Sequence, residues 1–258
     1  MSKLSFLVPR ISKTQFDSEA TAFLEKYCPE ALRTPMCVPI ETIATEKMQL
    51  TVLEYRMSED LSILGQICFT DGKAEIYDAD EDEYREIVVS AGTMIIDPDT
   101  YAKRNLGSKR NTMAHECYHW HRHRQYHQWA AKLSGEGTTA HRCPTMPKDE
   151  RLSKEWDDID WMEWQANNVA PKILMPVETV RQTYERMCEE SLKNPFVAKK
   201  LRPQAEWVIE QTAGFYQVSK QAAEIRLKEL KPDAAIRSSI RLRLLSAGRL
   251  LFEVTPLR

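Results

Sequence analysis

The sequence predicts an α+β fold, in which a small, mostly antiparallel sheet packs against several helices. Three observations lead to this prediction. Short runs rich in Val, Ile, Thr, Phe and Tyr are confined to residues 51–97. Apolar residues at helical spacing follow from about residue 108 almost to the end of the chain. The 258 residues are 42% hydrophobic, which is enough material for a sizeable core.

An N-terminal helical segment, residues 1–38, is expected to precede the sheet. Residues 16–27 carry apolar side chains at helical spacing and predict an amphipathic helix. Three prolines then break the chain. The apolar residues of one face predict a second, short helix over residues 40–47.

The strands are expected in five short runs. Asp71-Gly72 lies between the second and the third run and is the signal of a tight turn, so it predicts a hairpin formed by these two strands. The acidic segment 78–86 is typical of a solvated loop, and calcium binding there is the less favoured interpretation. The five runs are Thr51–Tyr55, Ile63–Thr70, Ala74–Tyr77, Glu86–Ser90 and Thr93–Ile96.

Helices are expected from Asp97-Pro98 onward. Residues 108–131 predict one long helix, and residues 134–156 predict an irregular loop because Gly, Pro and polar residues are frequent there. Trp161–Leu174 predicts the next helix, which Pro176 ends. Further expected elements are helices over 178–192, 203–213, 219–230 and 233–246, and a last strand over 250–255.

Charge and composition exclude some classes of function. Lys+Arg number 36 and Asp+Glu 38, and this balance disfavours a dedicated nucleic-acid-binding protein. No stretch approaches 18 apolar residues, so no transmembrane helix and no membrane partner are expected. The apolar run from Leu4 to Pro9 is too short for a secretory signal. Six cysteines without a C-x-x-C pair favour reduced thiols, and together these features predict a cytoplasmic protein.

The segment His115-Glu116-Cys117-Tyr118-His119 is the most informative part of the chain, because it contains an H-E-x-x-H motif. Residues i and i+4 of a helix lie on one face, so His115 and His119 can bind a single metal ion. Glu116 adjoins the first of these ligands, where its carboxylate can accept a proton from a water molecule. The motif therefore predicts a catalytic zinc site with Glu116 as the general base, which later protonates the leaving amine. Manganese remains the alternative metal.

A third ligand is needed, because catalytic zinc sites use three protein ligands. Glu163 is the best candidate. Ala166 and Ala170 lie on its face of the helix and allow close approach to the histidine helix. Asn167 lies one turn beyond Glu163 and is expected to give a ligand imidazole an outer hydrogen bond, a role for which His123 is a second candidate.

The surroundings of the motif resemble the ImmA/IrrE family of metallopeptidases. The resemblance rests on Gly92 with Ile95-Ile96-Asp97, on Arg110-Asn111-Thr112 before the motif, on the segment from Glu163 to Pro176, and on Val218–Leu230; it spans roughly residues 39–230. It implies a zincin-like domain over residues 39–192 and a C-terminal helical region over 193–258 packed on it. It also implies limited cleavage of a helix-turn-helix transcriptional repressor. This chain departs from the family pattern by an insertion at about 124–158 and by Pro171 within the Glu163 helix.

Several other residues of ligand or catalytic type have open roles. His123 and His127 continue the series of histidines spaced four residues apart that begins at His115 and His119. A solvated or cleft-lining helix end is favoured for them over a second metal site. His141-x-Cys143 lacks a partner pair for a structural zinc site, and Cys117 is expected to be packed and inert. The residue that stabilises an oxyanion is left open among Tyr118, Tyr126, His123 and His141.

Two alternative functions differ in class from a zinc endopeptidase. Residues 218–230 and the later arginines could belong to a DNA-binding regulator, although Arg237, Arg241, Arg243 and Arg249 define no single face. A protein-interaction module with a vestigial metal site is the other alternative, and the intact set of His115, Glu116, His119 and Glu163 speaks against it. The sequence indicates no oligomeric state.

Overall fold

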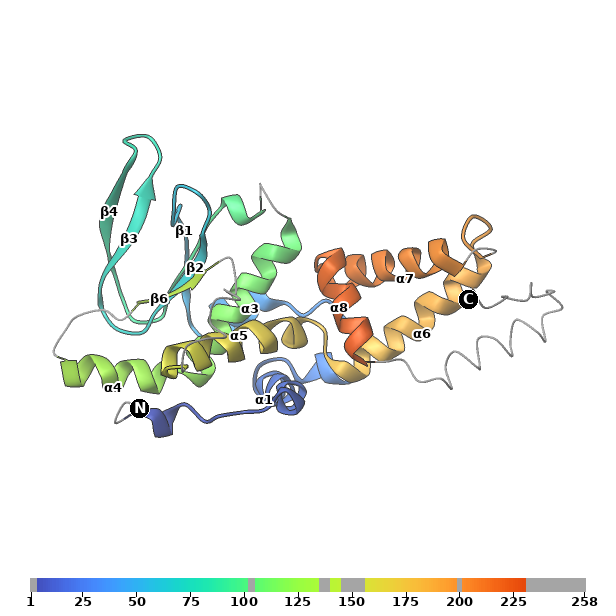
Figure 1. Cartoon of the computed structure of the whole chain (residues 1–258), viewed down its shortest axis with the longest axis horizontal. Coiled ribbons are helices and arrows are strands. Elements are labelled where there is room, and N and C mark those ends of the chain that lie inside the picture. The colour runs from blue at the N-terminus through green and yellow to red at the C-terminus, as the bar shows by residue number, and fades with distance from the viewer. Residues whose placement is uncertain (1–3, 102–104, 135–139, 145–155, 199–200, 231–258) are drawn as a thin grey trace.

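The structure is a computed structural model that describes residues 4–101, 105–134, 140–144, 156–198 and 201–230 (Figure 1). It confirms a mixed α+β fold. Helices α3 (Leu106–Arg122) and α5 (Asp158–Leu174) pack against each other at the centre. The strands lie on one side of this helix pair, helices α6 to α8 lie on the other, and α1 (Phe16–Tyr27) packs against α5 (Figure 1).

The described residues contain six strands, which form two separate units. The four-stranded sheet has the order β1 (Thr51–Glu54), β5 (Thr93–Ile96), β2 (Ile63–Cys68) and β6 (Ala140–Pro144). Its β1–β5 pair is parallel, and its other two pairs are antiparallel. Strands β3 (Gly72–Asp78) and β4 (Glu83–Val89) form an antiparallel hairpin of their own. Three of the four pairs are therefore antiparallel, as predicted.

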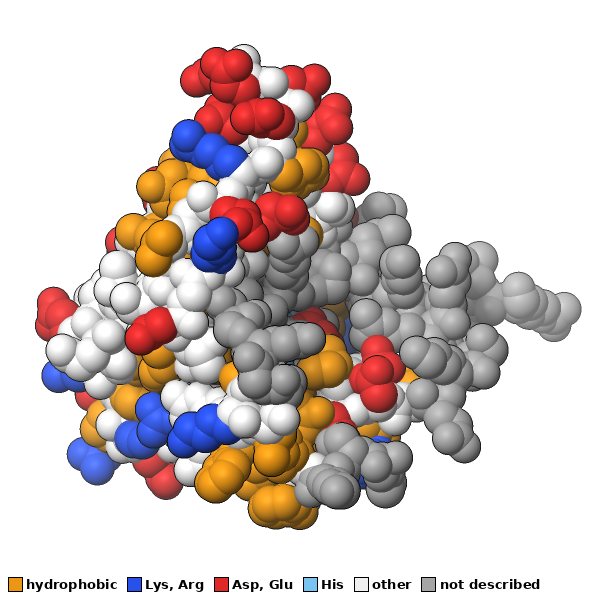
Figure 2. Space-filling view, turned by 90° about the vertical axis from the view of Figure 1, so that its left-hand side faces the viewer, with side chains coloured by type: hydrophobic (Ala, Val, Ile, Leu, Met, Phe, Trp, Pro, Cys, Tyr) orange, Lys and Arg blue, Asp and Glu red, His pale blue; other side chains and the backbone are white. Residues whose placement is uncertain are grey.

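The hairpin predicted at Asp71-Gly72 is wrong, because β2 and β3 belong to different sheets. The Asp71 carboxylate instead accepts a hydrogen bond from the Ala91 backbone N–H at 2.8 Å, which joins the two ends of the β3–β4 hairpin. The tight turn lies within the acidic segment, whose residues 83–86 form part of β4 rather than a loop. Exposed acidic side chains gather at this tip (Figure 2), among them Asp80, Glu81 and Asp82.

Strand β6 corrects the expectation of an irregular loop over residues 134–156. It pairs antiparallel with β2, and Ile67 faces His141 in the register. Its five residues include no Val, Ile or aromatic residue, so local propensity does not indicate a strand. The free edge of β2 supplies the hydrogen-bond partners that the sequence pattern does not reveal.

The remaining helices mostly start and end close to their expected limits. Residues 40–47 form α2 (Ile40–Thr42) and the π-helical turn η4 (Ile43–Lys47). The long helix expected over 108–131 is divided at His123 into α3 and α4 (Arg124–Ser134), which corrects that prediction. Pro171 lies within α5, which continues to Leu174. The others are α6 (Val177–Lys193), α7 (Leu201–Tyr216), α8 (Lys220–Leu230) and the short 3-10 turns η1 (Ser5–Leu7), η2 (Lys13–Gln15) and η3 (Pro29–Leu32).

The predicted helix 233–246, the strand 250–255 and the C-terminal arginines lie outside the described residues. No helix among the described residues is long and apolar enough to cross a membrane. Five cysteines are described as free thiols, namely Cys28, Cys37, Cys68, Cys117 and Cys188.

Gly65 brings β2 close to helix α3. A Cβ atom at Gly65 would lie 2.6 Å from Thr112 Cγ2 and 3.3 Å from the Ile95 carbonyl oxygen. Thr112 has a short, β-branched side chain on a buried stretch of α3, so it cannot move aside without shifting the helix.

We therefore expect Gly65→Ala to lower the free energy of unfolding by about 1–3 kcal/mol. Denaturant titration followed by circular dichroism measures the change. Gly214→Ala is the matched control: its Cβ would meet nothing within 4 Å on helix α7, and alanine should stabilise a helix by about 0.5–1 kcal/mol. Equal unfolding midpoints for Gly65→Ala and the wild type would contradict the close approach.

Candidate metal centre

Helix α3 presents the H-E-x-x-H motif to the interior. The side chain of Asn105 caps the helix by accepting a hydrogen bond from the Ser108 N–H, and the helix continues to Arg122. His115 and His119 lie one turn apart, and their Nε2 atoms are 2.9 Å from each other. Both imidazoles are buried. The expected helical placement of the two histidines is thus found.

Helix α5 brings Glu163 to these imidazoles. Asp157 and Asp160 form a capping box that starts the helix, and the buried alanines Ala166 and Ala170 face its partners in the core. Glu163 Oε1 lies 3.1 Å from His119 Nε2, and Oε2 lies 3.6 Å from His115 Nε2. The three candidate ligand atoms all lie within 4.8 Å of one another, so this buried cluster could hold a metal ion.

The chemistry of the cluster fits a cation. Two buried imidazole nitrogens and a buried carboxylate converge on one point, and a cation there would satisfy all three lone pairs. Both carboxylate oxygens of Glu116 are buried without a hydrogen-bond partner among the described residues. Burial and, secondarily, the charge of Glu163 raise the pKa of Glu116 well above its usual range. A divalent cation beside Glu116 would favour its charged form and so oppose this shift.

A chain of hydrogen bonds sets the proton positions behind His119. The carbonyl of Pro9 can only accept, so the Gln165 Nε2 donates to it at 2.9 Å and the Gln165 Oε1 faces His123. The Gln165 oxygen accepts from His123 Nε2 at 3.1 Å, which leaves His123 Nδ1 as the acceptor from His119 Nδ1 at 3.0 Å. His119 Nε2 then carries the lone pair that a metal needs.

This arrangement predicts the effect of replacing Gln165, which is buried. Gln165→Leu removes the acceptor for His123 and should weaken zinc affinity about 10–100-fold, because the tautomer of His119 is no longer set. Gln165→Glu keeps an acceptor toward His123 and should bind zinc more tightly than the leucine variant. Competition with a chromophoric chelator measures both affinities. Wild-type affinity in Gln165→Leu would mean that Gln165 only fills space.

The two residues expected behind the ligands lie in different places. His123 is buried and contacts His119 as described above. Asn167 is exposed and its side chain makes no hydrogen bond among the described residues, so it is not found bonded to a ligand imidazole. Asn167 lies on the Glu163 face of α5, as its spacing predicts. It is one full helical turn beyond Glu163, where it lines a cavity.

None of the described candidates for an oxyanion donor points freely toward the ligands. The Tyr118 hydroxyl donates to Glu19 of α1 at 3.0 Å, and the Tyr126 hydroxyl lies 3.4 Å from Asp158. His123 is engaged with His119 and Gln165. The side chain of His141, like that of Cys143, lies outside the described residues.

The other residues of ligand type form no second centre. Among the described residues, the cluster of His115, His119 and Glu163 is the one group of this kind close enough to hold a metal. His127 is buried, and its ring stacks on Phe69 with centroids 4.1 Å apart. Cys117 is fully buried as expected, and burial raises the pKa of its thiol.

Sequence reasoning missed Gln165. It lies two residues after Glu163, and nothing in its local pattern distinguishes it from a packing residue. Its role depends on Pro9, which is 156 residues away along the chain. The sequence therefore carries no local signal that could have identified Gln165.

Family models and curated proteins were both compared with this chain, and neither comparison gave a match. Fold and site together define a mixed α+β protein whose central helix pair carries a buried cluster of two histidines and one glutamate that could hold a metal ion.

Proposed function

We propose that the protein is a zinc-dependent endopeptidase with a zincin-like fold. The observation that carries this proposal is the convergence of His115, His119 and Glu163 from two packed helices, with the carboxylate of Glu116 buried beside them. Two histidines and a glutamate are the ligand set of many hydrolytic zinc sites, and manganese is the alternative metal. The resemblance of the surrounding segments to the ImmA/IrrE family supports the same reading.

Each residue of the site has a distinct task in peptide hydrolysis. Zinc, when bound, supplies a Lewis acid that polarises the scissile carbonyl and makes a water molecule more acidic. His115, His119 and Glu163 would hold it, and His123 and Gln165 keep the lone pair of His119 directed at it. Glu116 accepts the proton of the attacking water and then delivers it to the leaving amine.

Limited cleavage is expected rather than general proteolysis. Glu116 and the three ligand residues are at most 3% exposed, so a peptide reaches them only when its binding is guided by a wider surface. The family resemblance suggests a helix-turn-helix transcriptional repressor as the guided substrate. Incubation with any helix-turn-helix repressor encoded next to this gene, followed by intact mass spectrometry, should give one or two defined cuts that a chelator prevents.

A DNA-binding regulator is the outcome that would replace this proposal. Helix α8 would then have to enter a groove, although its Ala223, Arg226 and Leu227 are buried against the protein. Tight, salt-sensitive binding to a specific duplex, with no cut in any candidate repressor, would favour that function.

A further inference from the structure

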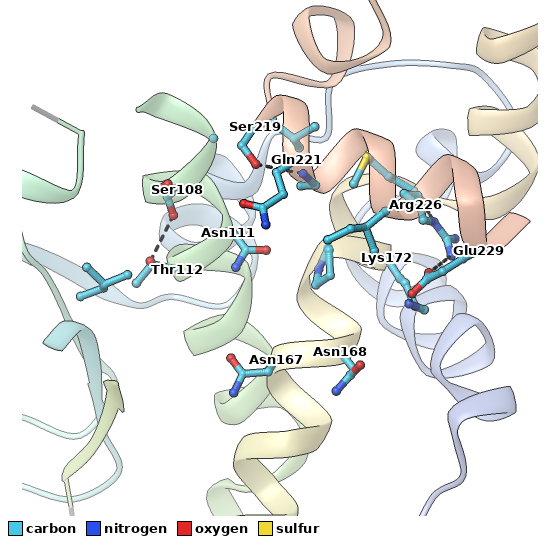
Figure 3. Close-up of a pocket in the computed structure, with 17 residues that line it drawn as sticks. Ser108, Asn111, Thr112, Asn167, Asn168, Lys172, Ser219, Gln221, Arg226 and Glu229 are labelled. Carbon is cyan, nitrogen blue, oxygen red and sulfur yellow. Dashed lines mark hydrogen bonds and ion pairs between the residues drawn. The ribbon is translucent and has the colours of Figure 1, made fainter. Parts of the chain in front are cut away.

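A cavity of about 400 Å³ lies between α3, α5 and α8 (Figure 3). Four carboxamide side chains line it, and they come from all three helices. The Asn168 side-chain N–H donates to the Trp164 carbonyl at 2.8 Å, and this bond does not use the side-chain oxygen of Asn168. The other three make no hydrogen bond among the described residues; they are Asn111, Asn167 and Gln221. The cavity therefore presents several donors and acceptors that are available to a ligand.

The charged groups of the cavity are already paired. Lys172 Nζ lies 2.9 Å from Glu229, and the buried Arg226 bonds Asp17 at 2.5 Å and lies 3.5 Å from Glu229. The two positive charges of Lys172 and Arg226 are thus balanced by the two carboxylates. Because no unpaired charge from the described part of the chain faces the cavity, a charged ligand side chain would lose its water without gaining an ionic partner there.

The position of the cavity connects it to the metal centre. Asn111 precedes His115 by four residues on α3, and Asn167 follows Glu163 by four residues on α5. Both asparagines therefore lie on the faces that carry the ligands, about one turn or 5.4 Å away. An extended peptide advances about 3.3 Å per residue, so a peptide cleaved at the metal centre would place a side chain here one or two residues from the cut.

Carboxamide groups are complementary to one another, since each offers both a donor and an acceptor. The cavity also has an apolar part, formed by Leu64, Pro171 and Ile225, that can cover the methylene groups of a side chain. We infer that this cavity is a substrate subsite for the uncharged carboxamide side chain of Asn or Gln, one or two residues from the cleaved bond. The inference rests on the proposed endopeptidase function.

Cleavage of a mixed peptide library, read by mass spectrometry, tests the subsite. We expect Asn and Gln to exceed Leu by about tenfold at one position within two residues of the cut. The double variant Asn111→Leu/Asn167→Leu should reduce this ratio to about one. Gln211→Leu, the same kind of change at an exposed position on α7, is the matched control and should keep the wild-type ratio.

Adding a negative charge to the cavity should change the preferred residue and so tests the subsite more sharply. Asn111→Asp adds an unpaired carboxylate to the cavity and should shift the preferred residue toward Lys or Arg. An unchanged profile in both Asn111→Asp and the double leucine variant would overturn the subsite, as would a wild-type profile without Asn or Gln.

Binding can be measured without catalysis in the full-length Glu116→Gln variant. Titration with N-acetyl-glutamine methylamide should shift the side-chain amide NMR signals of Asn111 and Asn167, whereas N-acetyl-leucine methylamide should not. Saturable shifts in this variant, together with no cleavage of any peptide by the wild-type protein, would overturn the endopeptidase and keep the carboxamide site. Cleavage without these shifts and without the Asn or Gln preference would overturn the subsite and keep the endopeptidase.

Discussion

Glu116→Gln is expected to retain the metal and the fold while it lowers peptide cleavage by about 10²- to 10⁴-fold. The amide has nearly the shape of the carboxylate, but it cannot accept the proton of the attacking water. The two oxygens of Glu116 have no hydrogen-bond partner among the described residues, so the substitution breaks no such bond there. Cleavage is measured by intact mass, and metal content by elemental analysis of the same preparation.

Glu41→Gln is the matched control for this experiment, because it makes the same chemical change on an exposed position of α2. It should cleave at the wild-type rate. If Glu116→Gln also turns over at that rate with full metal content, another residue acts as the base and the assignment of Glu116 is wrong.

Loss of a single ligand is expected to empty the metal site. Purified wild-type protein should carry about one zinc per chain, and His119→Ala or Glu163→Gln should reduce this to a small fraction, since three protein ligands are needed for a stable catalytic site. Chelation of the wild-type metal should lower the melting temperature, because a metal that binds only the folded state stabilises it by about 2.7 kcal/mol at a hundredfold excess over Kd.

His121→Ala provides the control on the same helix. The His121 Nδ1 lies 3.3 Å from the Tyr27 hydroxyl, on the side of α3 that faces α1, so its loss should leave metal content unchanged. Full metal content in Glu163→Gln would exclude Glu163 as the third ligand. Full content in His115→Ala would exclude the whole site.

The parts of the site that could be predicted are those with a local cause. His115 and His119 face the same way because of helical periodicity alone, and Glu163 was identifiable because small residues mark the face on which two helices meet. Asn167 shows the limit of this reasoning. Its spacing correctly predicts its face, but the rise of one helical turn moves it from the ligands to the cavity beside them.

The parts that could not be predicted depend on distant partners. Strand β6 forms on the edge of β2, about 75 residues earlier in the chain, although its own residues do not favour a strand. Asp71-Gly72 carries a genuine turn signal, but the chain there passes between two sheets instead of folding back on one. Local patterns identify turns and helices, whereas the choice of pairing partner depends on the whole core.

The hydrogen bond between Pro9 and Gln165 also sets the order in which the centre can be completed during translation. At about 5–20 residues per second, the 156 residues that separate them take roughly eight to thirty seconds to synthesise. Through most of that interval the nascent chain already holds the Pro9 carbonyl, and later the two histidines, but neither Glu163 nor Gln165 exists. The ribosome-bound intermediate can therefore offer a metal only a two-histidine half-site. The proposed hydrolytic activity therefore requires that α5 has been made and has docked onto the N-terminal segment, and a chain that ends before α5 is expected to be inactive.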